Sequence, residues 1–114
     1  MPKTHDPYDF FCGDGWFISG YLFDDAGSPL DLTGAAVTWK LDDLSTPPAN
    51  KITLGIGSGI TVLDTVNGII LVEPSAAQTA ALTPGMYRDS LRVTPSTSDP
   101  YTEWTGIIRA AAAL

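Results

Sequence analysis

The sequence predicts an all-β domain, a two-sheet β-sandwich of about seven antiparallel strands with one short helical corner. Short apolar or alternating segments recur along the 114 residues, and 11 Gly and 9 Pro separate them at close intervals. The chain shows no alternation of strands with long helices, which a parallel α/β fold requires. We therefore expect one domain over residues 10–109, with a flexible segment at 1–9 and a frayed tail at 110–114.

The first half of the chain contains three expected strands. Residues 16–23 are rich in aromatic side chains, which favour strands, and the Asp, Gly, Ser and Pro of 24–29 favour a turn after them. Residues 37–41 alternate apolar and polar side chains, so their apolar residues share one face of a half-buried strand. After a loop containing two consecutive prolines, residues 51–54 form a short strand.

A hairpin is expected next. The apolar segments 60–64 and 68–73 flank the dipeptide Asn67-Gly68, and both of its residues accept the positive φ of a type I′ turn. The two segments should therefore pair as antiparallel neighbours.

One short helix and two further strands complete the predicted fold. Residues 74–82 contain four alanines, and Ser75 can cap a helix of about two turns, which is too short to stand alone and is expected at a corner. Residues 85–93 and 101–109 carry apolar side chains in phase and are expected to form strands.

The segment before the strand at 85–93 refines the fold prediction. Residues 82–87 have the sequence Leu-Thr-Pro-Gly-Met-Tyr, in which Pro84 and Gly85 suit the two central positions of a type II turn. In immunoglobulin-like sandwiches a tyrosine at the place of Tyr87 bonds back to the upstream backbone. Trp39 is then a candidate for the core tryptophan. The prediction is an immunoglobulin-like sandwich without a disulfide.

Asp89 lies two residues after this tyrosine, where antibody domains place a cysteine. If Asp89 faces inward, it needs a partner such as Arg109, Arg88 or a tyrosine hydroxyl, or its pKa must rise. The alternative is a local bulge that turns its side chain outward. The sequence leaves both possibilities open.

Composition argues against several classes of partner. Thirteen acidic and six basic residues give a formal charge of −7, and the cations are scattered. Nucleic acids and anionic membranes both require concentrated positive charge, so neither is expected as a partner. The N-terminus lacks the apolar core of a signal peptide, and no segment approaches the ~18 apolar residues of a membrane span. With one cysteine and no possible intrachain disulfide, synthesis in the cytoplasm is expected.

No residue set predicts catalysis or a cofactor. Cys12 and His5 are close in sequence, but an incidental or structural thiol is favoured over a nucleophile, and one Cys with one His cannot make a four-ligand zinc site. Gly55, Gly57 and Gly59 lack the Lys-Ser/Thr of a phosphate loop. Five acids lie in two loops and could form a cation site there: Asp24, Asp25, Asp31, Asp42 and Asp43. Because aspartate is also an ordinary turn residue, solvated turns are favoured over a cation site.

An ordered series of short segments resembles a family. The segments are 13–16 (Gly-Asp-Gly-Trp), 24 and 27–35, 37–39 (Val-Thr-Trp), 59–60, 67–69 (Asn-Gly-Ile), 78–82, 85–88 (Gly-Met-Tyr-Arg) and 104–106 (Trp-Thr-Gly). Over residues 9–109 they are similar to the immunoglobulin-like amino-terminal domain of bacteriophage baseplate upper proteins and its short prophage relatives. Cys12 replaces the usual cation, and Asp89 stands where such sequences tend to have an aromatic residue.

The resemblance implies a non-enzymatic assembly module of a phage or prophage tail, which would reside in the virion once assembled. Its expected partners are other tail proteins or further copies of the chain, contacted through exposed strand edges or the outer sheet face. One candidate surface is the strand edge at 52–54. The other consists of the aromatic residues Phe10, Phe11, Phe17 and Tyr21. These aromatics could equally pack the N-terminal strand on the core. The alternative function is a ligand-binding or adhesion module, for glycan or with calcium.

Overall fold

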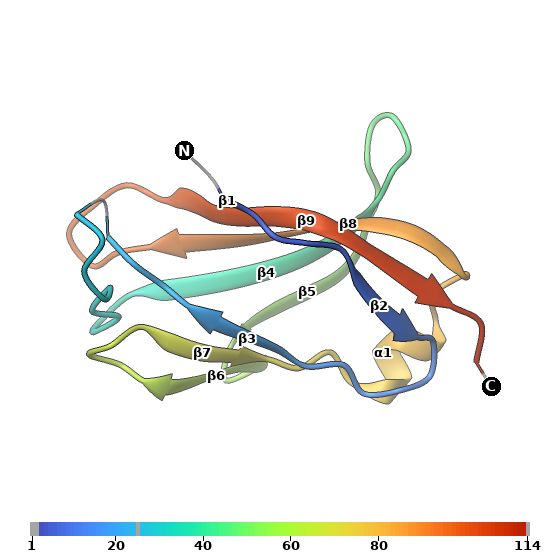
Figure 1. Cartoon of the computed structure of the whole chain (residues 1–114), viewed down its shortest axis with the longest axis horizontal. Helices are drawn as coiled ribbons and strands as arrows, with labels where there is room; N and C mark the ends of the chain where they lie inside the picture. Colours follow the sequence, from blue (N-terminus) through green and yellow to red (C-terminus); the bar gives the residue numbers. More distant parts are fainter. Residues whose placement is uncertain (1–2, 25, 114) are drawn as a thin grey trace.

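The computed structural model describes residues 3–24 and 26–113, which form a mostly β structure with one short helix (Figure 1). The elements are β1 (Lys3–Thr4), β2 (Tyr8–Phe11), β3 (Ile18–Tyr21), β4 (Ala36–Asp43), β5 (Asn50–Ile56), β6 (Gly59–Asp64), β7 (Ile69–Val72), α1 (Ala76–Ala80), β8 (Gly85–Thr94) and β9 (Tyr101–Ala111).

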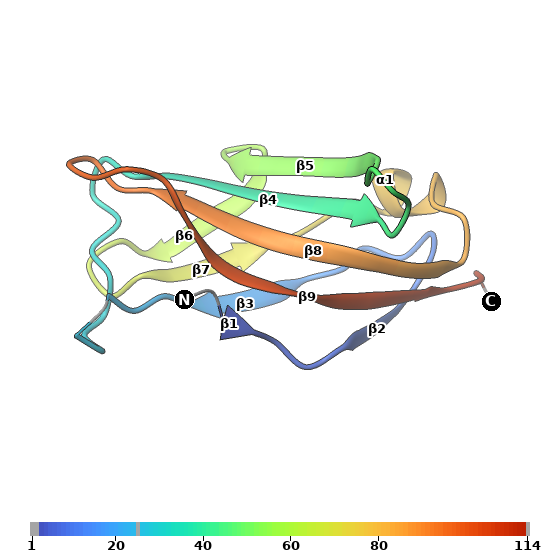
Figure 2. The same ribbon diagram turned by 90° about the horizontal axis from the view of Figure 1, so that it is seen from above.

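All of these strands belong to one mixed sheet in the order β1-β9-β8-β4-β5-β6-β7-β3, with β2 also beside β9. The sheet curls into a half-barrel, so the predicted division into two sheets is not clear (Figure 2). The join between its halves is short, because only the last two residues of β5 pair with the first two of β6. Gly57 and Gly59 make this join possible, with φ angles of 82° and 97° that favour glycine.

The curl encloses a single core. In β4 and β8 every second side chain is buried, as the predicted alternation requires, and Trp39, Leu41 and Leu91 are completely inaccessible. Burying one such side chain contributes about 1.5–3 kcal/mol. Trp16 and Ile18 close the core from the opposite end of the sheet. Buried residues from the middle and from the β3 end of the sheet therefore pack into one hydrophobic core.

The two N-terminal strands are a difference from the sequence prediction. Residues 1–9 were expected to be a flexible segment, yet β1 and β2 lie parallel to β9, with Lys3 opposite Trp104 and Tyr8 opposite Ile108. β1 has two residues and β2 has four, so neither is long enough to show a period. β9 also extends into the expected tail at 110–114, and Ala110 is buried. Residues 1, 2 and 114 lie outside the described residues.

Two turns differ in detail from the sequence prediction. β6 and β7 form the expected antiparallel hairpin, but Gly68 has a positive φ (66°) and Asn67 does not, so the turn is not type I′. The Asp64 carboxylate accepts hydrogen bonds from the backbone and side-chain amides of Asn67, which holds that residue in the ordinary region. Gly85 has φ 157°, far from the +80° of a type II turn.

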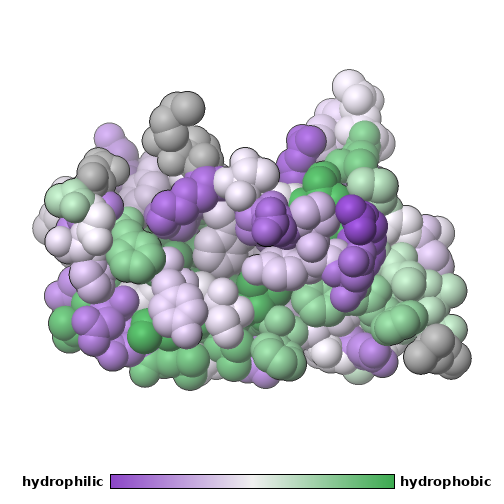
Figure 3. Space-filling view, in the orientation of Figure 1, coloured by the Kyte–Doolittle hydropathy of each residue, from purple (hydrophilic) through white to green (hydrophobic). Residues whose placement is uncertain are grey.

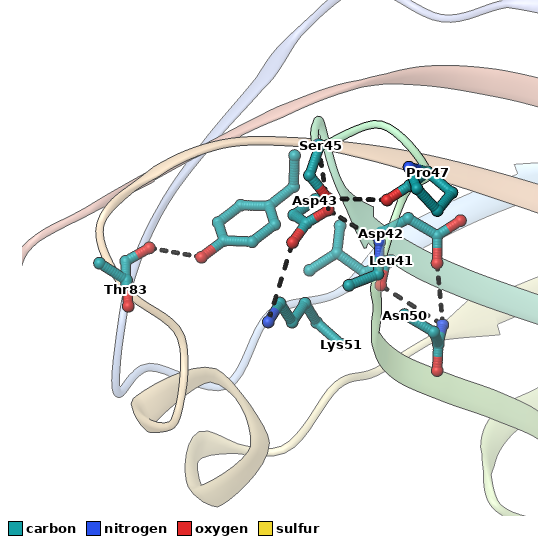
Figure 4. Close-up of polar contacts among 10 residues, drawn as sticks. Leu41, Asp42, Asp43, Ser45, Pro47, Asn50, Lys51 and Thr83 are labelled. Atoms are coloured by element: carbon teal, nitrogen blue, oxygen red, sulfur yellow. Dashed lines mark hydrogen bonds and ion pairs between the residues drawn. The ribbon is translucent and has the colours of Figure 1, made fainter.

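The corner before β8 confirms two other expectations. Ser75 caps α1, and the amide of Gln78 reaches back to the Ser75 N–H, which completes a capping box. The Tyr87 hydroxyl donates to the Thr83 carbonyl across the corner (Figure 4). Burial of the phenol raises the pKa of Tyr87 above its usual value of 10.0.

Candidate functional site

A buried carboxylate lies beneath the point where the N-terminal strands meet β9. Asp89, in the middle of β8, has no exposed surface and points inward. Its Oδ2 accepts from the indole N–H groups of Trp39 (2.9 Å) and Trp104 (3.0 Å), and its Oδ1 is bonded to Nε2 of His5. The predicted partners Arg109, Arg88 or a tyrosine are therefore wrong, because the donors come from two tryptophans and the N-terminal segment.

Hydrogen-bond geometry fixes the role of His5. Its Nδ1 lies 2.6 Å from the backbone carbonyl of Asp6, which can only accept, so Nδ1 carries a proton. Its other nitrogen is bonded to the Asp89 carboxyl group, which also accepts two indole protons. Both ring nitrogens are thus occupied, and His5 ties the segment between β1 and β2 to β8.

Two glycines make room for this cluster. A side chain at Gly106 would collide with the His5 ring, and a Cβ on Gly20 would lie 2.9 Å from the Trp104 ring. Trp104 therefore reaches from β9 across to β3, where it covers Gly20, and the His5 ring packs near it with centroids 6.4 Å apart. Sequence reasoning missed these residues, because their proximity depends on the curl of the sheet.

A groove of about 280 Å³ lies above the cluster, between the two ends of the sheet. We call it the β1–β3 groove, and its lining consists of Lys3, Thr4, His5, Tyr8, Ser19, Gly20, Tyr21 and Trp104. Figure 3 views the molecule from this side, where hydrophilic residues and residues of intermediate hydropathy lie together across the middle, above a more hydrophobic lower edge. Three aromatic rings and several hydroxyl groups thus face one opening.

The β3 wall of the groove is an open strand edge. The N–H groups of Trp16 and Leu22, on either side of β3, donate to carbonyls at the two ends of β7 (3.1 and 2.9 Å). Because hydrogen-bonded residues alternate along an antiparallel pair, the backbone groups of Ser19 and Tyr21 point the other way. Within the described chain no strand lies on that side.

The β1 wall is an open edge as well. The His5 N–H donates to the Thr105 carbonyl of β9 (3.0 Å), in register with the parallel pairing of β1. The backbone groups of the preceding residue, Thr4, therefore point away from β9 and toward the groove. Two sheet edges with available backbone groups border one opening.

A second, larger hollow of about 900 Å³ adjoins the first at Lys3. We call it the acidic hollow; residues of 23–31 and 95–103 line it, including Asp24, Asp31 and Glu103. Lys3 is bonded to Glu103 (3.2 Å) and lies over the Phe23 ring. Hydrogen bonds from the Thr33 hydroxyl and N–H lower the pKa of Asp31, so this carboxylate is ionised near neutrality.

The other predicted acids stabilise turns. Asp43 accepts from the Ser45 hydroxyl and N–H and from the Ala49 N–H, with Lys51 at 3.9 Å, and these bonds lower its pKa (Figure 4). Asp24 accepts from two N–H groups of its own loop, and Asp25 lies outside the described residues. Among residues 3–24 and 26–113 no group of three or more His, Cys, Asp or Glu side chains could hold a metal ion.

The structure separates the remaining candidates. Cys12 is buried in the core, whereas His5 is bonded to Asp89, so the two do not form the Cys–His pair that was considered. Phe10 packs on Trp16 with ring centroids 5.0 Å apart. Phe11, Phe17 and Tyr21 are 40%, 66% and 63% exposed. One predicted aromatic thus packs on the core, and three remain available at the surface.

The predicted edge at 52–54 is open in the structure. Residues 50–54 of β5 pair with β4, and the pairing with β6 begins at Gly55. Lys51 and Thr53 are exposed, while Ile52 and Leu54 are buried. A charged lysine on such an edge discourages pairing with another strand.

No family model matches the chain, and no curated protein matches it. A solved structure of a family 123 glycoside hydrolase from Clostridium perfringens, concerned with glycolipid glycan hydrolysis, is similar with a TM-score of 0.41 and 14% identity. The similarity covers 98% of this chain and 23% of that chain. In the part of the chain described here, no helix is long and apolar enough to cross a bilayer.

Proposed function

We propose that the curled sheet is a variant of the immunoglobulin-like sandwich. Three features support this assignment. β2 runs parallel to the last strand, β9; Trp39 is buried in the middle of β4; and Tyr87 bonds back to the backbone at the corner before β8. In this assignment β5 and β6 are the strands that pass from one layer to the other.

We further propose that the protein is a structural assembly module that acts by protein–protein contact. The observation that carries this proposal is the open edge of β3, where two residues direct backbone groups to the surface beside exposed aromatic side chains. Unpaired edges accept strands from other chains. The segments that resemble phage baseplate domains support a tail or prophage protein, made in the cytoplasm and assembled into a virion, whose partners are tail proteins or other copies.

The experiment is to co-express the chain with each protein encoded beside it and to measure complex masses by light scattering. We expect a defined complex or a homo-oligomer. Matched variants are Ser19→Pro and Ser19→Ala, because proline removes an outward N–H whereas alanine keeps it. A strictly monomeric chain without affinity for any neighbouring gene product overturns the proposal.

The groove favours a second candidate, a binding module for a glycan. Tyr8, Tyr21 and Trp104 offer ring faces, and the hydroxyls of Thr4 and Ser19 offer hydrogen bonds beside them. Saturation-transfer NMR with a panel of neutral oligosaccharides tests it. Transfer to a sugar that is lost in Tyr21→Ala supports this candidate, and the absence of transfer across the panel rejects it.

A further inference from the structure

We propose that the partner contributes an extended, basic segment that lies along the β1–β3 groove and adds a strand to β3. This inference rests on the proposed assembly function, and it names both the surface used and the chemistry of the occupant. It differs from association through β5 or through a sheet face.

Backbone chemistry indicates that the occupant is a polypeptide in extended form. Ser19 and Tyr21 on one wall and Thr4 on the other direct N–H and C=O groups toward the groove. On the β3 wall these groups alternate with residues bonded to β7, so they recur every second residue. An extended chain presents its own donors and acceptors at the same interval.

The floor of the groove determines which side chains fit. Trp104 covers Gly20, and Tyr8 and His5 lie beside it, so inward-pointing side chains of the occupant meet aromatic surface. The groove holds about 280 Å³, which suits small apolar side chains at alternate positions. Side chains of the occupant that point out of the groove would lie beside Tyr21, which is 63% exposed.

Charge complementarity indicates that the occupant is basic. The two basic residues in the groove lining are already bonded to acids, Lys3 to Glu103 and His5 to Asp89. Asp24 and Asp31 line the acidic hollow, which adjoins the groove at Lys3, and no ion pair joins either of them to a cation among the described residues. A lysine or arginine of the occupant that extends past Lys3 into the hollow would meet these carboxylates.

The other open edge does not suit the same occupant. β5 carries Lys51 on its exposed side, and a charged side chain on an edge discourages the pairing of an added strand. The Gly55 N–H bonds to the Ser58 carbonyl in the turn after β5, so by alternation Thr53 points its backbone groups away from β4. Thr53→Pro therefore blocks the β5 edge as Ser19→Pro blocks the β3 edge, and the two variants form a matched pair.

The test titrates the ¹⁵N-labelled full chain with three probes and follows amide shifts by NMR. The probes are the capped hexapeptide Lys-Thr-Val-Thr-Val-Lys, its counterpart with glutamate at both ends, and maltohexaose. We expect the basic peptide to shift the amides of Thr4, Ser19 and Tyr21, and to bind about tenfold more tightly than the acidic one, a difference of about 1.4 kcal/mol.

Variants separate the groove from the other edge. Ser19→Pro should weaken binding of the basic peptide about tenfold, whereas Ser19→Ala and Thr53→Pro should leave it unchanged within about twofold. If Ser19→Pro does not fold, Asp31→Asn serves instead, because its side chain is exposed and retains an oxygen for Thr33. We expect Asp31→Asn to weaken the basic peptide and to reduce its salt dependence.

Three results overturn the inference: amide shifts at 52–54 in place of β3, equal affinity for the two peptides, or binding of maltohexaose with no binding of either peptide. If no probe binds while light scattering still detects a complex that Ser19→Pro leaves intact, the groove is rejected and the assembly function stands. If no complex forms with any neighbouring gene product or copy, the assembly function itself fails.

Discussion

The His5 ring occupies the space that a side chain at position 106 would fill, and it is bonded there to Asp89. Gly106 lies in β9, between the N-terminal strands and β8. A histidine from the start of the chain can therefore reach the buried carboxylate of a strand 84 residues later, because the intervening strand offers a gap. This contact holds β1 and one wall of the groove in place.

Gly106→Ala should expel His5 from this position and weaken the attachment of β1. The buried carboxylate then loses one of its three partners, so we expect the free energy of unfolding to fall by about 2 kcal/mol. Urea denaturation measures it. The control is Gly15→Ala, where a Cβ meets nothing within 4 Å and the change should stay within about 0.5 kcal/mol. Equal effects of the two substitutions would contradict the assigned role of Gly106.

Asp89→Asn should destabilise the fold by about 1–2 kcal/mol. An asparagine keeps one oxygen for the two indole N–H groups, but it replaces the charge-assisted hydrogen bonds of a carboxylate with weaker neutral ones. The control is Asp9→Asn, since Asp9 is exposed and its pair with Arg109 is worth less than about 1 kcal/mol. Thermal unfolding of both variants gives the comparison, and a stability of Asp89→Asn close to that of the parent would reject the cluster as a stabilising element.

Tyr87→Phe should remove the hydrogen bond to Thr83 and cost about 1 kcal/mol at neutral pH. Burial raises the pKa of Tyr87, so the folded state favours the neutral phenol. Its contribution is present below pH 10 and is lost as the pH rises through the raised pKa. Stability should therefore fall less steeply above pH 10 in Tyr87→Phe than in the parent, and parallel curves in urea titrations at pH 9–11 would refute this.

Acid should destabilise the protein through three turn aspartates. Hydrogen bonds from Thr33 to Asp31, from Ala49 and Ser45 to Asp43, and from Asn67 to Asp64 lower the pKa of each below its usual value of 3.8. A lowered pKa stabilises the fold above 3.8, and that contribution is lost as the pH falls through the folded-state value. A variant in which Asp31, Asp43 and Asp64 are all replaced by asparagine should therefore lose less stability than the parent between about pH 4 and 2. Urea denaturation across this pH range measures the difference.

The strands of the middle and end of the chain could be predicted from sequence because their signals are local. The alternation of β4 follows from its own residues, and Ser75 with Gln78 specifies the start of α1. The partners of Asp89 could not be predicted in this way. They come from β4, β9 and the segment after β1. Their positions in the sequence do not show that these donors lie beside Asp89 in the fold.

The turns show the same limit on a smaller scale. Asn67-Gly68 correctly predicts a hairpin, but the carboxylate of Asp64 decides which conformation Asn67 adopts. Likewise, β1 and β2 pair with the edge that β9 offers, and strands of two and four residues are too short to be predicted from their own sequence.

The sequence by itself determined the all-β composition, the position of most strands, the helical corner and the tyrosine contact across it. Each of these follows from residues close together in the chain. Tertiary structure decided that the strands form one curled sheet, that Asp89 turns inward toward two tryptophans and a histidine, and that the two ends of the sheet face each other across a groove. The physical reason is that the burial of one shared core closes the sheet, and closure brings together edges and side chains that are remote in sequence.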